Sequence, residues 1–587
     1  MYSLIYIFKN KLFLQKLREL KFIVGPLASK LPIMLSLTIF LGVLELLGLS
    51  LIIPFLTAIQ SPDKLSDMKY WQVLNDFFLL TNFESRVIVL SLILLGVFTF
   101  KIVLNCFIQN LIIKFSYKLQ ASLRERLAIS YMRAPYLFHT RKRTNDIINT
   151  MLGHVSQFSK GIVGSLLKVF SEGIVILTIS IFLIAKFPIT ALFSISLIMM
   201  FVWFYVYKIK GRIAKLGSEL SSASSELIKT LNQGIKGLKE ARVLGKTEHF
   251  ENHIMVSSNR LSKINAETAF HQILPRFLLE FLIISVILIA LLTQIMVSGK
   301  NTEIINNLIL FGAASIRLLP SINNITVNLN QIYFAAPMTR QILDDLRETG
   351  DGAFSVEKKA TEPLISLEFK NLSFQFLGSE NKILDKVNFS IKRGEVVGVF
   401  GPSGSGKTTF MNIILGLIEF QSGEIILNKK MLTTEEWKRL LISSYVPQSP
   451  TIIDGSVREN IAFGEDFKEF DEQKIQISIE KAQLNKFVET LAYGADTVVG
   501  ENAVLFSGGQ KHRLAISRSF YFERGLIILD EVTAALDKKT EIELLGSIKE
   551  LKKHSAVILV SHSDQVKEFC DKVYNLNMGK LIEKNQA

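Results

Sequence analysis

Cysteine is scarce in this sequence, and its scarcity limits the disulfide bonds that the chain could form. The 587 residues include two cysteines, Cys106 in an apolar run and Cys570 near the C-terminal end. Because we expect these two segments on different parts of the protein, the cysteines cannot pair and no disulfide framework is predicted. Low-complexity tracts and short-period repeats are also lacking, which sets aside biased segments and repeat arrays.

The first thirty residues lack the features of a cleavable leader. They contain no small-residue cleavage site that closes an uninterrupted apolar core. Basic residues interrupt their apolar residues at Lys9, Lys11, Lys16, Arg18 and Lys21. We therefore expect residues 1–30 to form a retained amphipathic helix in the membrane interface and not a signal peptide.

Apolar residues are abundant, and basic residues are unevenly placed. A hydrophobic content of 49% and a mean hydropathy of +0.33 are too high for several soluble domains, so part of the chain belongs in a bilayer. The formal charge of +14 could indicate nucleic-acid binding or basic cytoplasmic loops. Lysine and arginine crowd the segments 117–165 and 211–264, whereas residues 60–85 carry Lys64 and Lys69 alone. This asymmetry follows the positive-inside rule, so we expect no nucleic-acid partner.

Apolar runs of the length that crosses a bilayer, about 20 residues, recur along the first part of the chain. They number six: 33–59, 86–116, 166–187, 190–210, 272–298 and 302–325. With the basic segments inside, both termini are predicted in the cytoplasm and the 60–85 loop outside. Apolar residues of that loop fall on one side at helical spacing, which fits either a short external interfacial helix or an ordinary capping loop.

The domain organisation follows from changes in pattern. Segments 117–165 and 211–264 keep helical spacing without apolar continuity, so we expect them to extend the membrane helices into the cytoplasm. The transmembrane domain then covers 31–345, and residues 346–364 form a linker. From 365 to 587 short β-rich runs alternate with helical ones, the pattern of an α/β domain with a largely parallel sheet.

A glycine-rich stretch carries the clearest chemistry. It lies between the apolar run Val396 to Phe400, which has strand character, and a helical segment that begins near Thr408. A strand, a glycine-rich turn and a helix start present backbone N–H groups to phosphates, while Lys407 adds a cation and the Thr408 hydroxyl is placed for Mg²⁺. The bare motif can arise by chance, but it predicts a nucleoside triphosphate site. Its residues are Gly401, Pro402, Ser403, Gly404, Ser405, Gly406, Lys407, Thr408 and Thr409.

Two later segments strengthen the prediction of a nucleotide site. Leu526 to Leu529 looks like a buried strand, and Asp530 and Glu531 follow it directly. One acid there can hold Mg²⁺ through its water shell and the other can polarise an attacking water. The stretch Phe506 to Gln510 precedes a helical segment, and its Ser507, Gly508 and Gly509 form a second phosphate-binding surface at a helix start.

Together these motifs resemble the ATP-binding cassette ATPases over residues 365–587. The Ser507-Gly-Gly-Gln510 signature is specific to that family. The resemblance implies ATP and Mg²⁺ as cofactors, with Glu531, His562 and Gln448 as catalytic residues and Thr408, Gln448 and Asp530 as metal-binding residues. It also implies that Phe376 stacks on adenine, that Asp537 closes a loop beside the nucleotide and that Glu501 touches the membrane domain.

This sequence departs from the family pattern at three positions. Phe376 stands where tyrosine is usual, which keeps the aromatic face, Phe506 replaces leucine, and Ala534 stands where serine is common. None of these changes removes a catalytic group, so we expect an active ATPase. In this family each ATP lies between the phosphate loop of one domain and the signature of another, which implies a homodimer.

The membrane part resembles, more loosely, the lipid-linked oligosaccharide flippases of bacteria. The resemblance rests on four stretches: Leu46 to Pro54, Phe100 to Asn105, Pro275 to Glu280 and Arg317 to Ser321. It implies that basic cavity residues handle a pyrophosphate-linked glycan and that an external helix in the 60–85 loop meets the polyprenyl tail.

Three cations within the predicted spans could form this anion pathway. They are Lys101, Arg276 and Arg317, and a cation inside a span costs at least about 2.5 kcal/mol and usually marks a pathway. Each has a plainer explanation, since Arg276 has Glu280 four residues on and Lys101 could snorkel to the interface. Lys101 also stands where those flippases tend to have arginine, which loosens the prediction of the head group.

The sequence as a whole predicts an exporter-type half transporter in the bacterial inner membrane. Six transmembrane helices and an α/β phosphate-loop ATPase domain would move a lipid-linked oligosaccharide or a related anionic glycolipid outward, driven by ATP hydrolysis. No cysteine protease domain is found near the N-terminus, which argues against export of processed peptides. A general lipid or drug exporter remains open, as does an ATPase that regulates a partner or channel.

Overall fold

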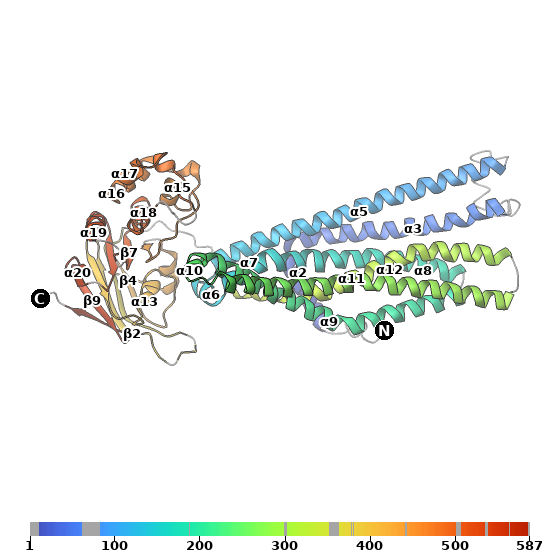
Figure 1. Cartoon of the computed structure of the whole chain (residues 1–587), viewed down its shortest axis with the longest axis horizontal. Helices are drawn as coiled ribbons and strands as arrows, with labels where there is room; N and C mark the ends of the chain where they lie inside the picture. The colour runs from blue at the N-terminus through green and yellow to red at the C-terminus, as the bar shows by residue number, and fades with distance from the viewer. Residues whose placement is uncertain are drawn as a thin grey trace. The chain divides into compact units, whose positions relative to one another are not determined.

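The computed structural model describes residues 11–60, 83–186, 188–298, 302–350, 363–376, 378–379, 381–440, 443–500, 506–533, 538–562 and 564–584. The chain divides into two compact units. One comprises Met1–Ala134 and Phe138–Phe354, and the other comprises Pro135–Leu137 and Ser355–Ala587. The first unit is helical and the second is α/β (Figure 1).

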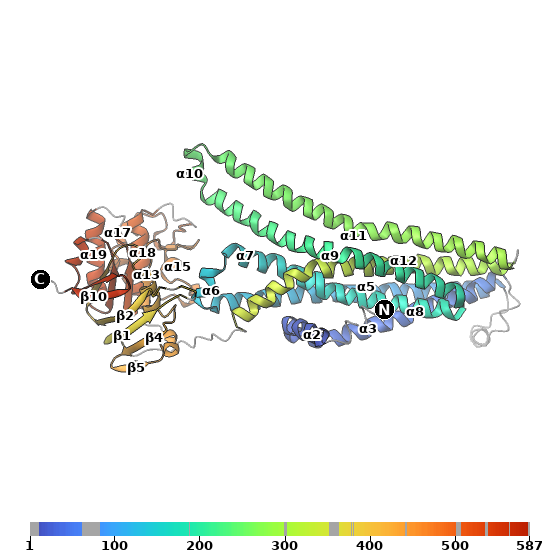
Figure 2. The same cartoon turned by 90° about the horizontal axis from the view of Figure 1, so that it is seen from below.

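Long helices make up the first unit. They are α3 (Leu31–Gln60), α5 (Phe83–Arg133), α8 (Ser165–Lys186), α9 (Pro188–Lys236), α11 (Thr247–Ser298) and α12 (Thr302–Glu348). Helix α3 runs beside α5, and α8 runs beside α12. Helices α9 and α11 lie side by side and are joined at one end by the short α10 (Leu238–Val243), as Figure 2 shows.

The helices are longer than a bilayer requires. Helix α5 has 51 residues and α11 has 52, so each is about 75 Å long at about 1.5 Å per residue, against a hydrocarbon thickness of about 30 Å. The prediction that segments 117–165 and 211–264 are helical is confirmed except at short breaks, which are residues 134–135, 142–143, 237 and 244–246. On which side of the membrane the excess lies stays a prediction.

Within the described residues, five helices are long and apolar enough to cross a membrane. They are Arg18–Gly48, Val87–Arg133, Thr144–Ala185, Ala191–Lys236 and Thr247–Ile289. The predicted sixth span, 302–325, lies in α12. The side chains of most residues of this span are not among those that the structure describes. The external helix predicted in the 60–85 loop also falls outside, because residues 61–82 are not among those described.

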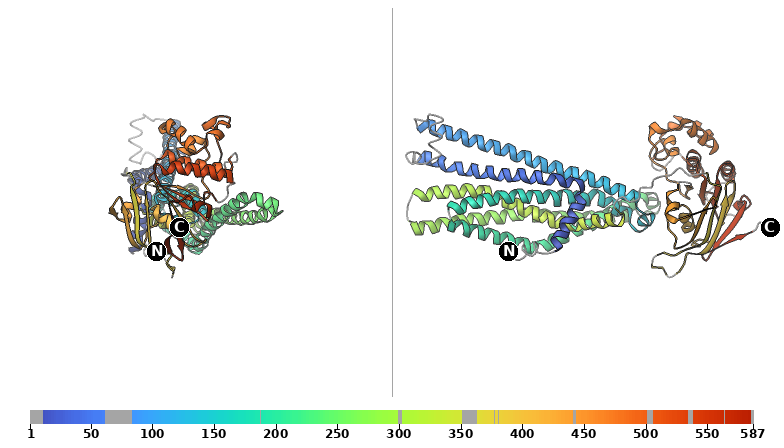
Figure 3. Two further views of the ribbon diagram at one scale, coloured as in Figure 1. Left: turned by 90° about the vertical axis from the view of Figure 1, so that its left-hand side faces the viewer. Right: turned by 180° about the vertical axis from the view of Figure 1, so that it is seen from behind.

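Short elements complete the helical unit. Helix α2 (Lys11–Val24) lies across the direction of the long helices, as Figure 3 shows, and a 3-10 segment, η1 (Gly25–Lys30), links it to α3. Helices α6 (Tyr136–Arg141) and α7 (Thr144–Asn149) precede two π-helical segments, η3 (Thr150–His154) and η4 (Gln157–Gly164). Sequence spacing did not predict the π-helices, because the pattern continues across them into α8.

Two sheets organise the second unit. The larger has the order β10-β9-β3-β8-β7-β6, and its central pairs are parallel, with Val399 opposite Val560. Its strands are β3 (Val396–Phe400), β6 (Ser443–Val446), β7 (Leu526–Asp530), β8 (Ala556–Val560), β9 (Lys572–Asn577) and β10 (Lys580–Lys584). The prediction of a largely parallel sheet is correct for this one.

The smaller sheet is antiparallel and was not predicted. Its order is β2-β1-β4-β5, from β1 (Ser366–Phe374), β2 (Leu384–Lys392), β4 (Ser422–Leu427) and β5 (Lys430–Leu432). Strand β2 alternates buried residues such as Val387 and Phe389 with more exposed ones such as Lys386 and Asn388. That alternation is typical of an antiparallel strand with one solvated face.

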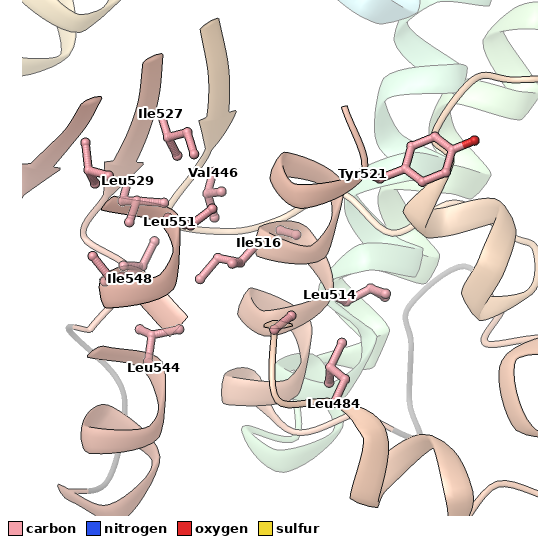
Figure 4. Close-up of a cluster of buried hydrophobic side chains, with 14 of the residues drawn as sticks. Val446, Leu484, Leu514, Ile516, Tyr521, Ile527, Leu529, Leu544, Ile548 and Leu551 are labelled. Atoms are coloured by element: carbon pink, nitrogen blue, oxygen red, sulfur yellow. The ribbon is translucent and has the colours of Figure 1, made fainter. Parts of the chain in front are cut away.

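Helices complete this unit. They include α13 (Lys407–Ile414), α14 (Thr434–Arg439), α15 (Val457–Ile461), α16 (Glu472–Lys481), α17 (Asn485–Glu489), α18 (Gly508–Tyr521), α19 (Lys538–Lys552) and α20 (Asp564–Lys567). Among them, α18 contacts β6 and α19 contacts β8 of the parallel sheet. In Figure 4, Leu514 of α18 and Leu544 of α19 belong to one buried cluster with Leu529 of β7. Strands β3, β7 and β8 run parallel with fully apolar interiors, so their carboxyl ends meet at one edge.

Candidate functional site

The loop after β3 is shaped by glycine. Gly401, Gly404 and Gly406 have φ angles of 154°, 79° and 101°, which other residues adopt only with strain. A Cβ on Gly401 would lie 2.2 Å from the Leu576 carbonyl oxygen, and one on Gly406 would lie 3.0 Å from a methyl carbon of Ile383. The loop therefore curls tightly over the start of α13 and turns backbone N–H groups toward one concave face.

Lys407 lies at the first position of α13. Its side chain is 8% exposed, and its Nζ donates to the carbonyl oxygens of Gly401 and Pro402 at 2.8 and 3.0 Å. Burial lowers the pKa of Lys407, while the charges of Glu531 and Asp530 oppose that shift. The ammonium thus stays inside the curve of the loop, close to two carboxylates, where it can meet a phosphate oxygen.

The loop fits a phosphate group on two further observations. The Ser405 hydroxyl is buried and has no hydrogen-bond partner among the described residues, which is unusual for a polar group without a ligand. Thr408 lies on the first turn of α13 and is exposed. Thr409 follows it on that turn, and Ser403 and Gly404 form the exposed outer part of the loop.

Glu531 is the centre of the candidate catalytic group. It follows β7 directly with a positive φ of 50°, a strained conformation that is common at functional sites. The Gln448 side-chain nitrogen donates to one carboxylate oxygen at 2.7 Å, and His562 Nε2 lies 2.9 Å from the other. The structure therefore brings together the three residues predicted to be catalytic, from the ends of β6, β7 and β8.

Asp530 lies beside this group at the end of β7. The hydroxyl of Tyr445 donates to its carboxylate at 3.0 Å. Burial raises the pKa of Asp530, and the Tyr445 hydrogen bond and Lys407 act against that rise. Tyr445 was not predicted, although its place three residues before Gln448 on the neighbouring strand could have suggested it. The Asp530 carboxylate, the Thr408 hydroxyl and the Gln448 side-chain oxygen are the kind of oxygen ligands that Mg²⁺ prefers, so these residues fit the ion.

The signature stretch caps α18. The Ser507 side chain accepts from the Gln510 N–H at 3.3 Å, and the Gln510 side chain accepts from the Ser507 N–H at 2.7 Å, which together form a capping box. Ser507 and Gly508 are exposed and Gly509 is buried. Backbone N–H groups at this helix start can receive an anion.

His512 links the signature helix to the catalytic group and was also missed. It is 7% exposed, and its Nε2 lies 3.0 Å from the Gln448 carbonyl oxygen. Its Nδ1 lies 3.0 Å from the Gly508 carbonyl oxygen, one turn back on α18. Its position two residues after the signature was the available signal.

Phe376 borders a cavity of about 320 Å³ at the end of the antiparallel sheet. Its ring meets that of Phe374 edge to face, with centroids 4.9 Å apart. Gln375, Lys382 and Gln421 also line the cavity, which offers an aromatic face with polar groups around it. The two remaining predicted residues of this domain, Asp537 and Glu501, lie outside the described residues.

One of the three predicted membrane cations, Lys101, is paired with an acidic residue. Lys101 of α5 forms an ion pair with Glu45 of α3 at 3.0 Å, with side chains 12% and 1% exposed, and lies over the Phe98 ring. Glu45 was missed, although it is the lone charge of the predicted span 33–59. Arg276 is exposed on α11, and the side chain of Arg317 lies outside the described residues.

The proposed partnership of Arg276 with Glu280 is not seen. Both side chains are exposed, and within the described part of α11 no ion pair joins them. Lys101 therefore pairs with Glu45, which sequence spacing did not suggest. Arg276 does not pair with Glu280, which sequence spacing did suggest.

Two family models match the chain. The model described as the ABC transporter transmembrane region matches residues 31–315, and the model described as ABC transporter matches residues 384–534. Between them they cover the membrane helices and most of the nucleotide site.

Curated relatives match most of the chain at modest identity. An ATP-dependent lipid A-core flippase of Haemophilus influenzae is 27% identical over 507 residues, which cover 84% of this chain and 84% of that protein. A protein of the same name from Ralstonia nicotianae is 25% identical, covering 80% of this chain and 79% of that protein.

A solved structure shares the fold. The structure of a bacterial Atm1-family ABC exporter with ATP bound matches with a TM-score of 0.75 and covers 94% of each chain. The sequence identity is 17%, so this similarity supports the fold and not a shared function.

Proposed function

Because the chain belongs to the ABC transporters, with the family's membrane region and its ATPase domain in one polypeptide, we propose that it is a homodimeric flippase for an anionic glycolipid. It moves a lipid-linked oligosaccharide or a related glycolipid outward across the bacterial inner membrane. The ATPase domain, over 365–587, and both termini face the cytoplasm. The transmembrane domain spans 31–345, and 346–364 link the two.

The observation that carries ATP-driven transport is the arrangement around Glu531. Its carboxylate is held between Gln448 and His562 at 2.7 and 2.9 Å, so it is oriented and ready to polarise a water for attack on a phosphate. Lys407 and the loop Gly401 to Thr409 hold the phosphates by charge and N–H donation. Bound Mg²⁺ would neutralise phosphate charge, held by Thr408, Gln448 and, through water, Asp530.

The signature supports a second copy of the chain as partner. Among the described residues of this domain, no hydrogen bond or ion pair joins the signature, Ser507 to Gln510, with the phosphate loop, Gly401 to Thr409. The exposed helix start at Gly508 is thus available to a nucleotide that is held by the loop of another copy. Two such copies would complete two ATP sites, and Asp537 would lie beside them.

The substrate class rests on the relatives and on Arg276. Relatives that match about four fifths of this chain are named for lipid A-core, itself a glycolipid. Arg276 lies on a candidate span, exposed in the single chain. Arg276 lies near the start of the predicted span 272–298, and because a cation within a span usually faces a water-filled cavity or an anion, its position supports such a pathway. Arg317 of α12 is proposed to join it.

Lys101 favours a second candidate. Its pairing with Glu45 removes one net charge from the proposed pathway. A pathway with fewer free cations suits neutral lipids or drugs, so a general lipid exporter is the alternative that this pair supports. In the glycolipid proposal, Lys101 instead reaches the substrate by exchanging Glu45 for a phosphate.

Mass spectrometry of lipids that co-purify with the transporter tests the substrate class. We expect a phosphate-bearing glycolipid with the wild type and its loss from Arg276→Gln. Lys263→Gln, which neutralises an exposed cation of the same helix outside the predicted span 272–298, is the matched control and should retain it. Neutral lipids alone in all three samples would favour the general exporter.

A further inference from the structure

A buried charged cluster, separate from the predicted membrane cations, lies near the C-terminal end of α12 in the helical unit. Asp345 of α12 is 3% exposed and Tyr131 of α5 is 2% exposed. The Tyr131 hydroxyl donates to one oxygen of the Asp345 carboxylate at 2.5 Å, and Lys142, just after α6, forms an ion pair with the other. We call Tyr131, Lys142 and Asp345 the α12 cluster.

The cluster joins segments that are far apart in the sequence. Asp345 is 214 residues from Tyr131 and 203 from Lys142. Aromatic rings close it on one side, since the Lys142 ammonium lies 5.4 Å from the centroid of Phe138 and 5.9 Å from that of Tyr131. His139 Nε2 lies 2.8 Å from the Tyr131 carbonyl oxygen and holds the turn between α5 and α6.

Burial of an ion pair is a costly way to hold helices together. Neighbouring residues of α12, including Ile342, Leu343 and Leu346, are already buried in an apolar cluster with helix α5. Apolar contact has no direction and tolerates sliding, whereas a buried carboxylate with two fixed partners specifies one register. The apolar residues already stabilise the contact between α12 and α5, and the α12 cluster therefore fixes the position of one helix along the other.

Asp345 lies near the end of α12, where a fixed position of the helix can affect how movement of the ATPase domain reaches the membrane helices. Helix α12 ends at Glu348, and the chain continues from it into the ATPase domain. Any displacement of the ATPase domain therefore acts on this end of α12 through the covalent chain. A tie at Asp345 passes that displacement to α5, which contains a candidate membrane span.

We infer that Tyr131, Lys142 and Asp345 are positioning residues that couple ATP turnover to movement of the membrane helices. The inference rests on the proposed ATP-driven homodimer but not on the identity of the lipid. Without the tie, α12 can shift at its end while α5 stays in place, so hydrolysis continues and transport per ATP falls.

A spin label on Cys106 provides the readout. Cys106 is exposed on α5, and the other cysteine, Cys570, is buried, so the native thiols allow selective labelling. The distance between the two labels of the homodimer, with and without Mg·ATP, reports membrane-helix movement without any substrate. The ATP-dependent change in the wild type tests the dimeric pump by itself, before variants are compared.

The variants separate coupling from stability. We expect Asp345→Asn to keep ATP hydrolysis within a few-fold of wild type and to lose most of the ATP-dependent distance change. The exchanged pair Lys142→Asp with Asp345→Lys should recover much of it, because it restores opposite charges. Arg260→Gln breaks an exposed ion pair with Glu226 (3.0 Å, both side chains 53% exposed) and should leave the change intact.

Two results would overturn the inference and leave the proposed function standing. One is an Asp345→Asn protein with the full distance change, and the other is an exchanged pair that performs no better than Asp345→Asn. If Asp345→Asn does not accumulate as folded protein, Tyr131→Phe decides. It removes one hydroxyl and keeps the ion pair, so we expect folded protein with a partial loss of the distance change. A full change in Tyr131→Phe would contradict the coupling role.

Discussion

Replacement of Glu531 by glutamine separates binding from hydrolysis most cleanly. Glutamine has the same shape and keeps one carbonyl oxygen. Its carbonyl oxygen can accept from the Gln448 side-chain N–H, which leaves the Gln448 oxygen for Mg²⁺, and its new N–H₂ can donate to His562 Nε2 in the tautomer that carries the proton on Nδ1. The contacts at 2.7 and 2.9 Å can thus persist, and the loss is confined to the ability to polarise water.

The expected fall in turnover follows from the loss of the ability to polarise water alone. Loss of a positioned general base lowers turnover by about 10²- to 10⁴-fold, which is about 3 to 5 kcal/mol of barrier. Affinity for ATP should stay near that of wild type, because Lys407 and the loop Gly401 to Thr409 are unchanged. The assay is phosphate release beside equilibrium binding of labelled ATP, in purified transporter at matched concentration.

Glu472→Gln is the matched control. Glu472 pairs with Arg458 at 2.7 Å on the surface, where its side chain is 60% exposed, so the same chemical change should cost at most about 1 kcal/mol of stability and leave turnover unchanged. Turnover by Glu531→Gln within about tenfold of wild type would refute the role of Glu531, because general-base catalysis is worth more than that.

Three further predictions concern other parts of the chain. Lys407→Ala removes a cation that also holds the loop through two carbonyl oxygens, so labelled ATP binding and hydrolysis should both fall; unchanged values for both would contradict the loop assignment. Lys101→Met removes the ammonium that pairs with the buried Glu45 carboxylate, so expression or thermal stability should fall by an amount equivalent to about 3 to 5 kcal/mol, and adding Glu45→Gln should restore much of it; equal stability of the single and double variants would show that the pair is not structural. Burial raises the pKa of the Cys570 thiol to about 12, so at pH 8 a maleimide should leave Cys570 unmodified in the folded transporter and should modify it after unfolding; rapid modification of Cys570 in the folded transporter would contradict its buried position.

Local patterns in the sequence were enough to predict much of the nucleotide site. The loop from Gly401 to Thr408, the two acids after β7 and the capped helix start at Ser507 each depend on residues close in sequence. A parallel sheet brings strand ends to one edge, which is why Gln448, Glu531 and His562 meet. Gln448 and His562 were predicted from the resemblance to the ATP-binding cassette ATPases and not from a local pattern.

Contacts between distant segments were not predictable in the same way. The Glu45 and Lys101 pair spans 56 residues and the Asp345 contacts span more than 200, so no spacing rule links them. Tyr445 and His512 act on their neighbours through side-chain direction, which the order of residues along a strand or helix does not reveal.

Backbone irregularity also escaped the sequence. The two π-helical segments, Thr150–His154 and Gln157–Gly164, lie where apolar spacing is that of an ordinary helix. Within them, a Cβ on Gly164 would lie 2.9 Å from the Ser116 hydroxyl of α5. Close helix approach of this kind depends on packing between helices and not on local propensity.

Movement of a glycolipid by the purified protein tests the central claim most directly. Wild-type protein and Glu531→Gln are reconstituted into liposomes that contain a fluorescent polyprenyl-pyrophosphate glycan, and the leaflet of the glycan is followed with a membrane-impermeant quencher. The proposal predicts translocation by the wild type with Mg·ATP, little without ATP, and little by Glu531→Gln, whose turnover we expect to be about 10²- to 10⁴-fold lower. Wild-type protein that hydrolyses ATP and leaves the glycan in its original leaflet would contradict the proposal.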